Sequence, residues 1–164
     1  MIIVDVFVPG AAKTKGSMEV RNRATGTMKE SVAGSSRWRA LMAQAVRDDI
    51  AARFPWPPDG HAQVRPILPW PGAVSVTVEA YLTPPVLHNG RTLPWDDAIW
   101  HQAGDLDKLV RNVLDALGST SKNTRMNGGA IVDDNLVCRI VANKHVAGPS
   151  GALSAGVRII VETL

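Results

Sequence analysis

The chain has 164 residues, a length that fits one domain and is enough to bury a core without disulfide or metal support. Hydrophobic residues make up 45% and charged residues 20%, which excludes global disorder, and the net charge of +3 permits nucleic acid as a partner without requiring it. The single cysteine, Cys138, excludes an internal disulfide and a cysteine-rich zinc site, and it suits a reducing compartment. Since no apolar run approaches the ~20 residues of a membrane span and the N-terminus does not resemble a signal peptide, we expect a cytoplasmic protein with one domain over residues 1–164.

The first third of the chain predicts a strand, a basic loop and a helix. Apolar residues alternate along residues 1–8, which is typical of a strand. Residues 10–34 are polar, basic and glycine-containing, which predicts a loop with a short hairpin around Thr25-Gly26. Apolar residues then recur at helical spacing from a cap at Ser35 or Ser36 to about Arg53.

The remaining two thirds predict three more strands and a second helix. A proline-rich connector over residues 54–72 precedes an alternating strand at 74–82, and an irregular segment follows at 83–104. A helix is predicted from Asp105 or Asp107 to about Leu117, followed by a polar loop at 118–130. The last two strands are predicted around residues 136–142, with Leu136, Cys138, Ile140 and Ala142 on one face, and at 156–163. This order predicts an α+β domain with a mixed sheet of about four to five strands and two main helices.

Two pairs of aspartates bracket the second helix. Asp105 and Asp107 stand where an irregular segment enters the helix, and Asp133 and Asp134 stand where a glycine-rich loop enters a strand. If that strand lies beside the helix, three or four carboxylates meet at one edge of the sheet. Such a cluster repels itself unless a divalent cation neutralises it, and Mg²⁺ suits carboxylate ligands. Carboxylate-held Mg²⁺ beside a basic surface is typical of phosphodiester cleavage.

Simpler interpretations of the same residues stay open. The first aspartate pair is also typical of a helix cap, and the second pair is also typical of a turn. Asp107, Arg111 and Asp115 share one helical face, which is expected either for exposed ion pairs or for an arginine that reaches a phosphate. Lys108 on the helix and Lys144 at the end of a strand can direct their side chains toward the sheet edge where the aspartates are expected to meet.

The string GDLDKLVRNVLDAL, followed by GGAIVDDNLV, resembles the RusA family of Holliday junction resolvases. Asp105 to Leu109 match the family's D-[LI]-D-[NK]-L motif, and Leu114 to Leu117 match its L-D-A-L helix end. Asp133, Asp134, Asn135 and Val137 match the last part of the family's pattern. The N-terminal VPGAAKTKGSMEV and the segment from Ser36 to Arg39 are also similar to the family's opening strand and first helix.

The resemblance implies a homodimeric, Mg²⁺-dependent endonuclease that resolves four-way DNA junctions by paired nicks, with Mn²⁺ as a possible substitute metal. It implies Asp105, Asp107 and Asp134 as essential acids and metal ligands, with Asp133 as a further ligand. Arg111 stands where the family's best-studied pattern has a lysine, so a catalytic role through positive charge is expected rather than proton donation. No small-molecule cofactor and no membrane are implied.

The basic residues then acquire an expected role as a DNA-facing surface that neutralises phosphates. This set comprises Lys13, Lys15, Arg21, Arg23, Lys29, Arg37, Arg39, Lys108 and Lys144. Two other functions stay open: a nuclease of the same fold that acts on other branched DNA, and a DNA-binding protein that cuts nothing. A sugar transferase with a D-x-D motif is excluded by size and by the lack of a nucleotide-binding βαβ unit.

Overall fold

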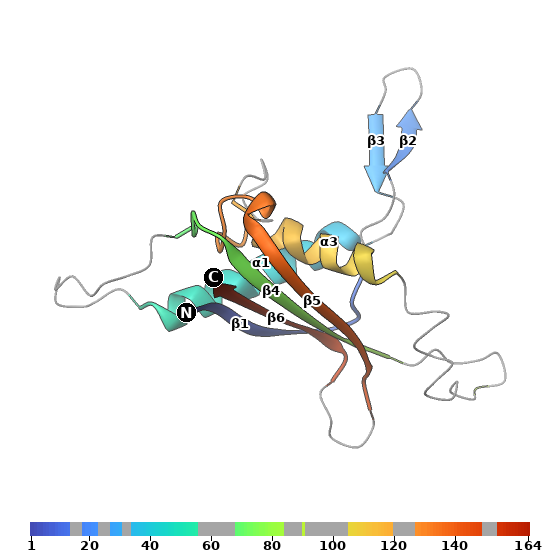
Figure 1. Ribbon diagram of the computed structural model, residues 1–164. Coiled ribbons are helices and arrows are strands. Elements are labelled where there is room, and N and C mark those ends of the chain that lie inside the picture. Colours follow the sequence, from blue (N-terminus) through green and yellow to red (C-terminus); the bar gives the residue numbers. More distant parts are fainter. Residues whose placement is uncertain are drawn as a thin grey trace.

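In a computed structural model of the chain, the residues whose placement is described are 1–13, 18–22, 27–30, 34–55, 68–83, 90, 105–119, 127–148 and 154–164. A four-stranded sheet is the centre of the fold, with the strand order β1–β6–β4–β5 (Figure 1). These strands are β1 (Ile2–Pro9), β4 (Val74–Leu82), β5 (Val137–Val146) and β6 (Gly156–Thr163). β5 runs parallel to β4, whereas the other two pairs are antiparallel, so the predicted mixed sheet is confirmed.

Two helices cover one face of this sheet, α1 (Ser35–Arg53) and α3 (Leu106–Leu117) (Figure 1). Alternate residues of the central strands point toward them, and Val76, Val78 and Ile159 are fully buried there. The helices contribute Met42, Val46, Val113 and Leu117 to the same core. The predicted α+β class and the two predicted helices are therefore confirmed.

The predicted hairpin is also present. β2 (Met18–Asn22) pairs with β3 (Thr27–Glu30) in a separate antiparallel ribbon that stands away from the sheet (Figure 1). The turn at Thr25-Gly26 lies outside the described residues. So do most residues of the predicted connectors, namely residues 56–67, 84–89, 91–104 and 120–126.

Two local predictions are wrong. Gly34 rather than a serine stands at the N-cap of α1, because its φ of 81° turns the chain into the helix, and Ser35 is instead buried in the first turn. Cys138 is exposed rather than in the core. The register of β5 against β4 shifts between Val74 and Ser75, which pair with Val137 and Arg139, and leaves Cys138 as an extra residue. A bulge of this kind interrupts the alternation on which the prediction depended.

None of the described helices is long and apolar enough to cross a membrane.

Candidate functional site

The site begins at the C-terminal end of α3, where a returning segment satisfies the last carbonyl groups of the helix. The backbone N–H of Gly128 donates to the Ala116 carbonyl at 2.7 Å, and those of Ala130 and Ile131 donate to the Leu117 carbonyl at 3.1 and 3.3 Å. These carbonyl groups have no partner within a helix, so an external donor stabilises the end. The segment that precedes the second aspartate pair is thereby fixed to α3.

Asp133 has a structural contact in this arrangement. Its Oδ1 accepts a hydrogen bond from the backbone N–H of Asn135 at 3.0 Å and caps the short 3₁₀ helix η2 (Asp134–Leu136). The turn interpretation therefore holds for Asp133. This cap directs the chain so that Asp134 stands exposed at the entrance to β5.

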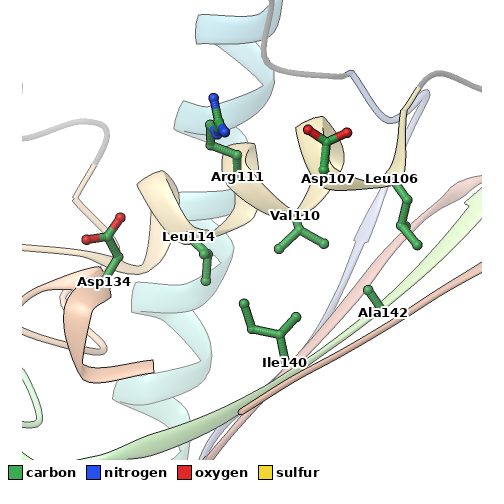
Figure 2. Close-up of a pocket in the computed structure, with 8 residues that line it drawn as sticks. All are labelled: Leu106, Asp107, Val110, Arg111, Leu114, Asp134, Ile140 and Ala142. Atoms are coloured by element: carbon green, nitrogen blue, oxygen red, sulfur yellow. The ribbon is translucent and has the colours of Figure 1, made fainter. Parts of the chain in front are cut away.

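Asp107, Arg111 and Asp134 line one pocket between α3, η2 and β5, with a volume of about 430 Å³. Its remaining lining is apolar and consists of Leu106, Val110, Leu114, Ile140 and Ala142. Figure 2 shows Val110 and Leu114 directed toward Ile140, whereas the charged ends of Asp107 and Arg111 project away from the strand. The pocket is therefore an apolar gap with charged groups at its rim.

The two aspartates of this rim come from opposite ends of the pocket. In Figure 2, Asp134 lies beside the η2 end and Asp107 lies beside the first turn of α3, with Arg111 between them. Within the described parts of the chain, no group of three or more His, Cys, Asp or Glu side chains is gathered closely enough to hold a metal ion. The structure thus brings two of the four predicted carboxylates to one pocket.

The side chain of Asp105 pairs with Lys108, a contact that the sequence analysis did not predict. Asp105 occupies the N-cap position of α3 but makes no side-chain capping hydrogen bond, and its Oδ2 lies 2.6 Å from Nζ of Lys108. The hydrogen bond from Lys108 and its charge, together with the charge of Lys144, lower the pKa of Asp105. The same contact raises the pKa of Lys108. Both predicted lysines therefore act electrostatically on Asp105.

The donor set of this region suits a hard divalent cation. Mg²⁺ is commonly held by one or two protein carboxylates, with water and substrate phosphate oxygens completing its coordination. Asp107 and Asp134 offer two exposed carboxylates at one pocket, and the exposed Asp105 stands at the start of the same helix.

The predicted basic surface is only partly described. Lys13 and Arg37 are exposed, as a phosphate contact requires. Lys15 and Arg23 lie outside the described residues, and only the backbone is described for Arg21 and Lys29 in the hairpin.

Arg39 has a contact that the sequence does not reveal. Its side chain is only 12% exposed, and its Nε donates to Oδ1 of Asn112 at 2.9 Å and lies 3.6 Å from Asp115 Oδ2. This position favours a structural role between α1 and α3. Asn112, which sequence reasoning missed, is fully buried. In the sequence, Asn112 stands out only as a polar residue on the apolar stripe of the helix, beside Leu109, Val113 and Ala116.

A search of protein-family models found no match to this chain, and a search of curated proteins found no significant relative.

Proposed function

We propose that the chain is a Mg²⁺-dependent, structure-specific endodeoxyribonuclease that resolves four-way DNA junctions as a homodimer in the cytoplasm. The single observation that supports it most is that Asp107, Arg111 and Asp134, from separate parts of the chain, line one pocket. The two aspartates belong to the two motif halves that carry the RusA resemblance.

Each residue then has a distinct task. Asp107 and Asp134 would be the residues that hold the metal ion, and Asp105 would join them when DNA phosphates compete for Lys108. The metal supplies Lewis-acid activation of water and of the phosphoryl group. Arg111 provides positive charge for the oxygens of the scissile phosphate, where a preorganised charge stabilises the transition state. Lys144 and Lys108 add positive potential on the substrate side.

The decisive experiment is cleavage of a synthetic four-way junction in Mg²⁺, with flap and linear duplexes in parallel. Asp107→Asn and Asp134→Asn are each expected to abolish nicking while leaving junction binding intact. Asp48→Asn is the matched control, because it makes the same change at an exposed position on α1 outside the pocket. Cleavage of flaps in preference to junctions would redirect the proposal to other branched DNA.

A second candidate function has one observation in its favour. Asp105 is paired with Lys108, as expected for a protein whose carboxylates are structural and that binds DNA without cutting it. Tight junction binding with no nick in Mg²⁺ or Mn²⁺, by a protein shown to be folded, would favour this function over the nuclease.

A further inference from the structure

A buried hydrogen-bond network holds the helix that carries Asp107 and Arg111. Asn112 in α3 has no exposed surface, and a buried amide is costly unless its donor and acceptor are both used. Both are used here: Oδ1 accepts from Nε of Arg39 at 2.9 Å, and Nδ2 donates to the backbone carbonyl of Lys13 at 2.8 Å.

The two partners of Asn112 belong to different parts of the fold. Arg39 lies in the first turns of α1, and Lys13 lies on the chain that leaves β1. Arg39 also approaches Asp115, which follows Asn112 by nearly one helical turn, so α1 contacts α3 at two successive positions through one guanidinium group. The network therefore joins three segments at one point.

Asn112 lies on a different side of α3 from the pocket, and Asp115 lies between the two sides. Asp107 and Arg111 are four residues apart and share the pocket side, whereas Asn112 is turned about 100° from Arg111 around the axis. The apolar contacts of α3 are non-directional, whereas the hydrogen bonds of the network depend on angle. Hydrogen bonds weaken steeply when their angles change, so the network resists rotation of the helix.

We propose that Asn112 is a positioning residue: its bonds to Arg39 and Lys13 hold the rotation of α3 that keeps Asp107 and Arg111 at the pocket, opposite Asp134. This inference rests on the proposed function only where it expects an effect on cleavage. The positioning of the pocket residues is a statement about the fold and is tested separately.

Three variants separate the two bonds of Asn112. Asn112→Asp keeps the acceptor for Arg39 but removes the donor to the Lys13 carbonyl. Arg39→Met removes the other bond and leaves the contact with Lys13. Asn112→Leu removes both in a side chain of similar size. Arg39→Lys is the conservative variant, since its ammonium group can still donate to Asn112. Asn143→Leu is the matched control, because it makes the same change at an exposed position of β5.

The first measurement is single-turnover cleavage at saturating junction DNA, below the unfolding temperature of every variant. The three network variants are expected to lower the rate about 10- to 100-fold, as small misplacements of reacting groups do, with the dissociation constant for DNA changed less than about threefold. Arg39→Lys is expected to restore much of the rate. Unchanged rates in folded Asn112→Leu and Arg39→Met would overturn the proposal, and so would a loss confined to DNA affinity.

The second measurement does not depend on catalysis. The carboxyl carbon signal of Asp107 and the amide exchange of α3 are compared by NMR in the wild-type chain, Asn112→Leu and Asn143→Leu. We expect the Asp107 signal to shift and α3 to exchange faster in Asn112→Leu alone. If the wild-type protein cuts nothing, the proposed function fails, and this comparison still decides the positioning role. An unmoved Asp107 signal with only a lower melting temperature would refute it.

Discussion

At the scale of single residues, the four aspartates of the two sequence motifs make different contacts. Asp107 and Asp134 line the pocket, Asp133 caps η2, and Asp105 pairs with Lys108. Adjacent positions in the sequence therefore carry different tasks. Asp133 accepts a hydrogen bond from the backbone N–H of Asn135, whereas the neighbouring Asp134 is exposed at the pocket.

The role of Arg111 is tested by its replacement. Since an arginine stays protonated, it can supply charge but no titrating proton. We expect Arg111→Ala to lower single-turnover cleavage about 10²- to 10³-fold, the usual cost of removing one charge-stabilising donor. Arg111→Lys is expected to keep activity within about tenfold, because the charge remains. An alkaline limb that appears in the pH–rate profile of Arg111→Lys together with a rate above wild type would contradict a purely electrostatic role.

Lys108 controls the protonation of Asp105. Its hydrogen bond is the largest cause of the lowered pKa of Asp105, and its charge adds to the effect, whereas Lys144 contributes through charge alone. We therefore expect Lys108→Met to raise the pKa of Asp105 toward its ordinary value, and Lys144→Met to raise it less. Titration of the side-chain carboxyl signals by NMR measures both shifts. Equal shifts in the two variants would disprove the direct contact.

At the scale of secondary-structure elements, the site depends on the contact between the end of α3 and the segment that leads to Asp134. Gly128 makes this contact possible, because a Cβ at that position would press against the Ala116 carbonyl oxygen and stand 3.0 Å from Val46 Cγ1. Neither the helix alone nor the returning segment alone assembles the pocket.

Gly128→Ala is expected to force these segments apart and to lower the free energy of unfolding by about 1–3 kcal/mol, as overpacking does. It is also expected to reduce cleavage, since Asp134 moves relative to Asp107. Gly118→Ala is the control, because its Cβ would meet no atom closer than 4.0 Å. Urea unfolding and junction cleavage measure the two effects. Equal stability of the two variants would argue against this contact.

The pairing of β1 with β6 carries an ion pair with a pH dependence. Arg158 donates two hydrogen bonds to the Asp5 carboxylate at 2.9 and 3.0 Å, and they lower the pKa of Asp5 below its ordinary value of 3.8. A lowered folded-state pKa stabilises the protein above the unfolded-state pKa, and the contribution is lost as the pH falls through the folded-state pKa.

Asp5→Asn is therefore expected to lower the free energy of unfolding at pH 7 by about 0.5–1 kcal/mol, a value reduced by the partial exposure of the pair. The difference from wild type should shrink as the pH falls below 3.8 toward the lowered folded-state pKa of Asp5. Urea unfolding at pH 7 and at several pH values below 3.8 checks this, with Asp48→Asn as the exposed control. A difference that persists undiminished in acid would exclude the ion pair as its cause.

At the scale of the whole molecule, the net charge of +3 includes two arginines of α1, Arg37 and Arg39, that differ in exposure. Arg37 is exposed, whereas Arg39 is joined to Asn112 and Asp115. Only an exposed cation can release counterions from DNA when it binds a phosphate. The net charge of +3 therefore includes the charge of Arg39, which already contacts Asn112 and Asp115 and is less accessible to a phosphate than that of Arg37.

Arg37→Ala is expected to reduce the salt dependence of junction binding by about one unit of log–log slope without changing the melting temperature. Arg39→Ala is expected to do the reverse, lowering stability by about 1–3 kcal/mol because Asn112 loses a buried partner. Fluorescence anisotropy over a range of salt concentrations and thermal unfolding measure the pair. The same salt slope for both variants would contradict the structural role of Arg39.

The sequence by itself determined the α+β class, the two helices and the strands of the sheet, because periods of two and of about 3.6 residues are local properties of the chain. Only the tertiary structure decided that Asp107 and Asp134 share a pocket while Asp105 turns to Lys108. It also decided that Cys138 leaves the core at a bulge and that Asn112 is bonded inside it. These outcomes depend on strand register and on contacts between distant segments, which residue spacing does not encode.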